Sequence, residues 1–165
     1  METPISPTII TGGGRCGTTA FMRFIHKAKG FDACFSDALI HENSTTVFSA
    51  NHHGGYEYFL TSDSPDDAFR HCPHFIKSPK FTVHLNSLIN EGKVLPNHIF
   101  LLIRDYKKSA QSRLDRNLLY LEDKNLRQYN SRYSDLKNQE VFFQRCIGIV
   151  MDTISKHDLN FTVLR

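Results

Sequence analysis

A glycine-rich loop near the N-terminus joins a short apolar segment to a helix-like segment. Residues 8–11 (TIIT) have the composition of a buried strand, residues 12–19 read GGGRCGTT, and residues 20–25 (AFMRFI) favour a helix. A strand, a glycine loop and a helix start in this order form a cradle, because backbone N–H groups and the positive end of the helix face an anion. The order therefore predicts a strand end that binds a phosphate group.

The loop departs from the usual nucleoside triphosphate pattern at one position. That pattern reads G-x-x-x-x-G-K-[ST]. The spacing from Gly12 to Gly17 is kept, but Thr18 stands where lysine is expected, and a cation comes three residues earlier, at Arg15. The displaced cation argues against ATP hydrolysis and favours another phosphorylated donor.

The rest of the chain alternates between strand-like and helix-like segments. In chain order these are residues 74–77, 83–90, 98–103, 107–121, 141–154 and 160–164. The alternation predicts a three-layer α/β/α domain with a mainly parallel sheet, similar to P-loop nucleoside triphosphate hydrolases. We expect residues 1–165 to form one domain. The sequence ends directly after the strand-like residues 160–164, so we expect this domain to lack its C-terminal part.

Bulk composition excludes several classes of protein. A net charge of +3 without a basic run does not favour a nucleic-acid binder. The four cysteines are scattered and show no C-x-x-C spacing, so we expect a reducing compartment, no disulfide framework and no metal. No window approaches the roughly 20 apolar residues that cross a bilayer. We therefore expect a soluble, cytoplasmic protein without a membrane segment.

A second candidate site follows the most apolar strand. Arg104 comes directly after residues 98–103, and Ser112 lies eight positions later. If a helix starts near Tyr106, Ser112 lies about two turns along it and can fold back beside Arg104 to hold a second phosphate. Ligands of parallel sheets bind at the carboxyl ends of the strands, so the loop and Arg104 are expected to converge. Alternatively, Arg104 pairs with its neighbour Asp105.

These two segments together resemble the sulfotransferases that use 3′-phosphoadenosine 5′-phosphosulfate (PAPS). The 5′-phosphosulfate loop of that superfamily commonly reads basic-[ST]-G-T-T, and residues 15–19 (RCGTT) match it with Cys16 in place of the small hydroxyl residue. Arginine in the basic position is similar to bacterial and tyrosylprotein sulfotransferases. The family's 3′-phosphate element has an arginine at a strand end and a serine eight positions on. Tyr106 replaces its frequent proline.

The resemblance implies in-line transfer of a sulfuryl group from PAPS to a hydroxyl or amine of a carbohydrate, peptide or small-molecule acceptor, without a metal. Arg15 is then the catalytic cation. The implied donor-binding residues are Gly13, Gly14, Arg15, Cys16, Gly17, Thr18, Thr19, Arg104 and Ser112. Residues 77–79 (KSP) look like the family's substrate-side segment, although a lysine that ends a strand often only reaches solvent. For Cys16 we favour packing against the loop over a catalytic thiol.

The family also implies a catalytic base, either a histidine after a strand or a glutamate some distance beyond the loop. Glu42 fits the second pattern, 27 positions after Arg15. The competing candidates are His41, Asp37, His52 and His53. A carboxylate acts as a base near neutral pH only if burial or a partner raises its pKa, so the choice stays open at this point.

Two other functions compete with the sulfotransferase. The first is a P-loop kinase for a nucleotide or small molecule, in which an arginine replaces the loop lysine and activity requires ATP and magnesium. The second is an incomplete domain that binds a nucleotide without turnover.

Overall fold

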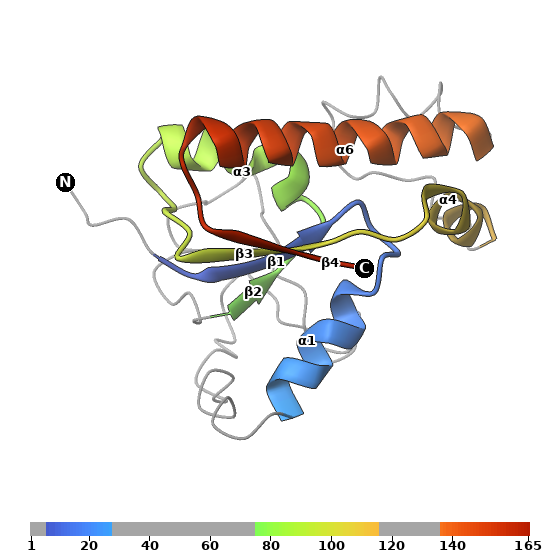
Figure 1. Cartoon of the computed structure of the whole chain (residues 1–165), viewed down its shortest axis with the longest axis horizontal. Helices are drawn as coiled ribbons and strands as arrows, with labels where there is room; N and C mark the ends of the chain where they lie inside the picture. Colours follow the sequence, from blue (N-terminus) through green and yellow to red (C-terminus); the bar gives the residue numbers. More distant parts are fainter. Residues whose placement is uncertain (1–5, 28–74, 116–135) are drawn as a thin grey trace, which may run out of the picture.

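Four parallel strands form the sheet of this protein in the computed structural model, which describes residues 6–27, 75–115 and 136–165 (Figure 1). The strands are β1 (Thr8–Gly12), β2 (Phe75–Lys77), β3 (His98–Leu102) and β4 (Phe161–Leu164). They are arranged in the order β2-β1-β3-β4, and each pairs with its neighbours in parallel. The predicted α/β class with a parallel sheet is confirmed.

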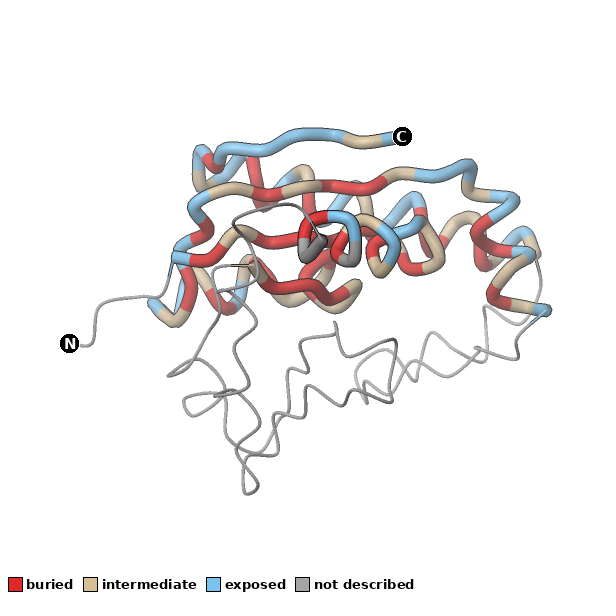
Figure 2. The backbone as a smooth tube through the Cα atoms, turned by 90° about the horizontal axis from the view of Figure 1, so that it is seen from below, coloured by how far each residue is buried: buried red, intermediate tan, exposed pale blue. Residues whose placement is uncertain are grey.

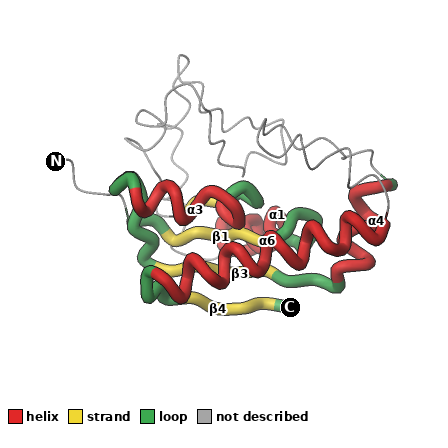
Figure 3. The backbone as a smooth tube through the Cα atoms, turned by 90° about the horizontal axis from the view of Figure 1, so that it is seen from above, coloured by secondary structure: helices red, strands yellow, loops and turns green. Residues whose placement is uncertain are grey.

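Helices cover both faces of the sheet. They are α1 (Thr18–Lys27), α3 (Phe81–Asn90), α4 (Tyr106–Leu114) and α6 (Leu136–Lys156). Helix α1 lies on one face, α3 and α6 lie on the other, and α4 lies beyond the ends of the strands, against α6 (Figures 1 and 3). Among the described residues, no helix combines the length and the apolar character needed to span a bilayer.

The central strands β1 and β3 bury alternate residues on the two faces of the sheet. Ile9, Ile99 and Leu101 belong to the cluster that packs against α3 and α6, whereas Ile10 and Leu102 belong to the cluster that packs against α1. This alternation with period two is what a pleated strand covered on both faces requires. Figure 2 shows the buried residues gathered along the central strands and the exposed residues along the last strand.

The register of the sheet fixes where the candidate site lies. Gly12 is opposite Leu102, and Ile10 is opposite Lys77, so the carboxyl ends of β1, β2 and β3 lie on the same side of the sheet. The glycine loop follows the carboxyl end of β1, and Arg104 lies just beyond the carboxyl end of β3. The expected convergence of the loop with Arg104 is confirmed.

All four described helices differ in length from their sequence expectations: α1 and α3 each begin two residues earlier than expected, α1 also ends two residues later, and α4 and α6 differ by more. Helix α6 begins at Leu136 instead of 141, because its polar first turn still packs: Leu136 lies against an apolar cluster, and Gln139 is buried. Helix α4 ends at Leu114, where Asp115 forms the C-cap. The residues at 116–121, which we expected to continue it, lie outside the described part of the chain.

Candidate anion-binding site

The glycine loop folds through three residues with left-handed backbone conformations. Gly14 has φ 79° and Gly17 has φ 93°, which glycine adopts without steric cost. Arg15 has φ 57°, a conformation that costs an L-residue about 1 kcal/mol. The N–H of Gly14 donates to the carbonyl of Gly12 at 2.8 Å and closes the first turn of the loop. Helix α1 then starts at Thr18, so the loop hydroxyls lie in its first turn.

Two loop glycines are needed because other atoms approach them closely. A Cβ on Gly13 would lie 2.5 Å from Cδ1 of Phe143, a fully buried ring of α6 beneath the loop. A Cβ on Gly12 would lie 2.5 Å from the sulfur of Cys16. The first part of the loop is therefore packed against the interior.

Arg15 contacts the second predicted segment directly. Its Nε donates a hydrogen bond to Oγ of Ser112 in α4 at 3.2 Å, a contact between residues 97 positions apart in the sequence. Ser112 is half-buried and lies on a helix that begins at Tyr106, as the sequence predicted. The two motifs therefore meet in one site.

Arg104 also reaches the loop. Its Nη1 donates to the carbonyl of Arg15 at 3.2 Å, and its side chain is otherwise exposed. Asp105 has a different role, because its carboxylate caps α4 by accepting from the N–H of Lys108 at 2.8 Å. Arg104 is thus directed to the loop, where its guanidinium is accessible to a ligand.

Lys77 joins the site from β2, although it was not among the predicted binding residues. Its Nζ donates to Oγ1 of Thr19 at 3.0 Å, and the residue is only 1% exposed. The structure thereby decides the alternative that the sequence left open, since this lysine reaches the loop and not the solvent. The signal in the sequence was its position at the end of a strand beside β1, in the segment that resembles the family.

Cys16 packs beside the loop, with its side chain against the cluster that contains Ile10 and Met22. Burial raises the pKa of its thiol above the ordinary value. The backbone N–H groups of Gly14, Cys16 and Thr18 and the charge of Lys77 oppose that rise in pKa. The thiol is therefore protonated at neutral pH, in line with the expected packing role. The same N–H groups lie where they can act on a negative charge.

A hollow opens between the loop, the end of β3, α4 and α6. It is lined by Gly13, Gly14, Cys16, Leu102, Ile103, Arg104, Tyr106, Ser109, Phe143 and Ile147. Tyr106, which stands where the family often has proline, contributes to this wall. The hollow is small, with room for about one water molecule, and its lining is apolar apart from a few polar groups and one cationic residue, Arg104.

The candidates for the catalytic base lie outside the described residues. They are Glu42, His41, Asp37, His52 and His53. Within residues 6–27, 75–115 and 136–165, no group of three or more histidine, cysteine or carboxylate side chains is placed to hold a metal ion. The described part of the site therefore consists of cations, hydroxyls and backbone amides.

Searches against family models, curated proteins and solved structures give no match for this chain. The function proposed below is therefore inferred from the geometry of the loop and its neighbours.

Proposed function

We propose that this chain is a PAPS-dependent sulfotransferase of the P-loop type. The observation that carries the proposal is the contact of Arg15 with both parts of the second motif: its side chain with Ser112 and its carbonyl with Arg104. A donor with two separate phosphate positions needs two such groups of ligands within one molecule's length. The 5′-phosphosulfate is assigned to the loop, and the 3′-phosphate to Arg104 and Ser112.

The environment of Thr19 supports a PAPS-type donor over magnesium ATP. In the nucleoside triphosphate loop, the hydroxyl at this position binds Mg²⁺. Here that hydroxyl accepts a hydrogen bond from the buried Nζ of Lys77. An ammonium group therefore contacts the hydroxyl that would bind the metal in a kinase. Lys77 and Arg15 together supply the positive charge that metal and lysine supply there.

The proposed reaction is a direct displacement at sulfur. The acceptor oxygen or nitrogen forms a bond to sulfur while the bond between sulfur and the bridging oxygen of the 5′-phosphate breaks. The acceptor's proton passes to a base, for which we propose Glu42, and adenosine 3′,5′-bisphosphate leaves. The guanidinium of Arg15 and the loop amides stabilise the charge that develops on the sulfuryl and bridging oxygens. The acceptor is a carbohydrate, a peptide or a small molecule, and the proposed compartment is the cytoplasm.

Calorimetry with adenosine 3′,5′-bisphosphate and with ATP tests the proposal. We expect the bisphosphate to bind in the presence of a chelator, and more tightly than ATP with magnesium. Arg104→Ala should weaken bisphosphate binding at least about tenfold, because it removes a charge-assisted contact. Arg145→Ala, which removes an exposed arginine on the outer side of α6, is the matched control and should bind as the wild type does.

A turnover assay with radiolabelled PAPS separates binding from transfer. Arg15→Ala should lower kcat far more than it weakens bisphosphate binding, since Arg15 is assigned to the transferring group. Tighter binding of magnesium ATP, or unchanged bisphosphate binding by Arg104→Ala, would show that the site is not a PAPS site. The first of these results would favour the kinase. Bisphosphate binding without turnover would favour a binding domain.

A further inference from the structure

One buried arginine next to the site has no part in the reaction proposed above. Arg113 follows Ser112 in α4, and only 8% of its surface is exposed. Its guanidinium carbon lies 5.6 Å from the ring centre of Phe142 and 5.8 Å from that of Phe143, both on α6. These are distances at which a cation interacts with an aromatic face. The arginine is therefore held on a fixed aromatic platform.

The same platform supports the glycine loop. Phe143 is the ring that a Cβ on Gly13 would strike, and Nη1 of Arg113 lies 3.6 Å from where a Cβ on Gly14 would be. Arg113 thus approaches the loop from the interior, beside Gly14, whereas the exposed Arg104 donates to the carbonyl of Arg15. An anion held by the loop would have a guanidinium on each side.

Burial gives this charge a large effect at the loop. Loss of water around Arg113 lowers the pKa of its guanidinium, and repulsion from Arg15 lowers that pKa further, while Cys146 opposes the shift. Both causes disfavour positive charge here while the loop holds no anion. A bound anion would oppose both causes and favour the charged guanidinium, because attraction between charges is stronger where water is excluded.

We propose that Arg113 is a charge-supplying residue of the anion site, acting through the loop from its buried side without contacting the ligand. This inference rests on the anion-binding role of the loop in the proposed function, and not on the identity of the donor. The competing explanation is structural, in which Arg113 only joins α4 to α6 by stacking on Phe142 and Phe143. The two explanations differ in what happens when an anion binds.

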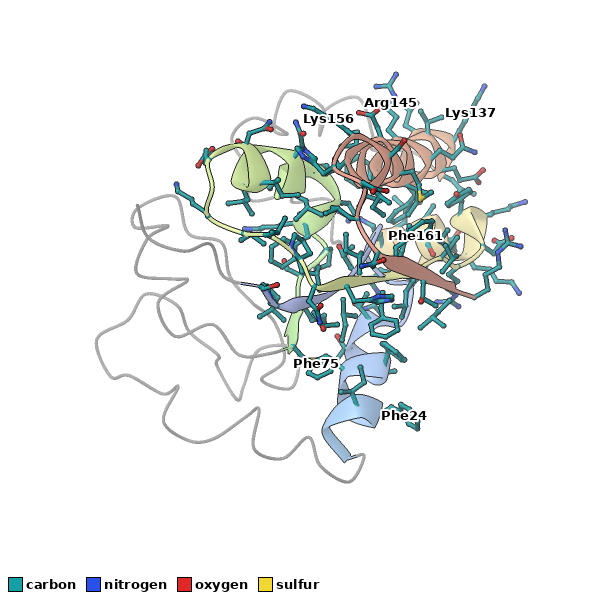
Figure 4. The ribbon with its side chains drawn as sticks, turned by 60° about the vertical axis from the view of Figure 1, so that its left-hand side comes forward. Phe24, Phe75, Lys137, Arg145, Lys156 and Phe161 are labelled. Atoms are coloured by element: carbon teal, nitrogen blue, oxygen red, sulfur yellow. The ribbon has the colours of Figure 1, made fainter. Side chains whose placement is uncertain are left out.

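The test compares the binding of inorganic pyrophosphate and of adenosine 3′,5′-bisphosphate by calorimetry at low and at moderate salt. Arg113→Met removes the charge and keeps an apolar side chain against the rings, and Arg113→Lys keeps the charge. Arg145→Met is the matched control, because Arg145 points away from the sheet on the outer side of α6 (Figure 4). Arg113→Gln replaces the methionine variant if that variant does not fold.

We expect the neutral variant, Arg113→Met, to bind both anions about tenfold more weakly, by a similar factor at low and at moderate salt, because a buried charge is screened little. Arg113→Lys should remain within about threefold of the wild type, the size of effect expected when charge is retained. The rise in melting temperature on adding pyrophosphate should be reduced in the neutral variant, because weaker ligand binding gives less stabilisation. The control should match the wild type in all three measurements.

The outcomes separate this inference from the proposed function. Wild-type affinity in the neutral variant, or equal losses in the neutral and lysine variants, would overturn the role of the charge while leaving the sulfotransferase proposal intact. Pyrophosphate binding that depends on Arg113, without preference for the bisphosphate over ATP, would support the inference and overturn the donor assignment. A wild-type chain that binds neither anion would overturn both.

Discussion

The shape of the loop depends on a few residues whose environments differ in clear ways. Arg15 adopts a left-handed backbone at some cost, and that backbone is held by the hydrogen bonds to its carbonyl and its side chain. Non-glycine residues with such conformations are concentrated at functional sites, where the surrounding structure holds them. The loop is therefore formed before a ligand arrives, and less free energy is spent on ordering it.

Two glycines should respond in opposite directions to the same substitution. Gly13→Ala places a methyl group against the buried Phe143 ring and should lower the free energy of unfolding by about 1–3 kcal/mol, as overpacking does. Gly148 lies in α6, where an added Cβ would meet no atom within 4 Å beyond its own stretch of helix, so Gly148→Ala should raise the free energy of unfolding by up to about 1 kcal/mol, because alanine favours helix. Urea denaturation of both variants measures the two changes. A Gly13→Ala protein as stable as the wild type would mean that Phe143 does not lie beneath the loop.

Among individual residues, those that belong to a short sequence motif could be predicted from the sequence. Arg15 and Thr19 were recognisable from the loop pattern, and Ser112 from its spacing to Arg104. Lys77 was ambiguous, because only the pairing of β2 with β1 brings its ammonium group to Thr19. Arg113 gave no signal, since its burial depends on how α4 lies across α6. Contacts made by tertiary packing carry no short-range pattern.

Among the elements, the strands were the easiest to predict. Each is a short run rich in apolar residues; the central strands β1 and β3 are also buried on both faces, and such runs stand out in the sequence. Helix ends were harder, as the start of α6 at Leu136 illustrates. Its first turn reads LKNQE, and only its packing on α4 and α3 makes Leu136 and Gln139 part of the interior. Apolar periodicity detects the middle of a helix better than its ends.

The packing of α6 against α3 predicts a pH dependence of stability. Burial raises the pKa of Cys146 to about 11, although a hydrogen bond with Thr82 and the charge of Arg113 oppose this rise. The unfolded thiol, with an ordinary pKa of 9.0, releases its proton first. The native state then holds more protons than the unfolded state, so the free energy of unfolding falls between pH 9 and about 11, by about 2 kcal/mol.

Cys146→Ala isolates this contribution, because it removes the thiol and leaves every other group that titrates in the same range. Chemical denaturation from pH 8 to 11 should give a shallower decline for the variant than for the wild type. The comparison uses the slopes, since the lost side-chain volume lowers the variant's stability by a constant amount. Parallel curves for the two proteins would contradict the assigned pKa.

For the molecule as a whole, the described sheet has one edge that is poorly covered. Strand β4 lies at this edge, and Phe161 and Val163 are each 41% exposed. By register they lie opposite Ile99 and Leu101, on the face that α6 covers. Helix α6 covers the neighbouring strands more fully than β4, and edge strands with apolar side chains tend to pair with other chains.

Val163→Lys should therefore reduce aggregation on heating, as followed by light scattering, because a charge at an edge opposes pairing with another chain. Its free energy of unfolding should stay within about 0.5 kcal/mol of the wild-type value, since the position is exposed. Ser155→Lys adds the same charge at an exposed position of α6 and serves as the control. Equal suppression by both variants would point to net charge, and not to the edge, as the cause.

The strand order also governs when the site can form during synthesis. Strand β1 is made first but lies between β2 and β3, so both of its hydrogen-bonding edges wait for partners that are translated later. At roughly 5–20 residues per second, translation from Gly12 to Ser112 takes on the order of 5–20 s. Lys77 and Arg104 are added during this interval, and Ser112 is added at its end. The proposed anion site is therefore completed only when Ser112 has been translated, long after the loop itself.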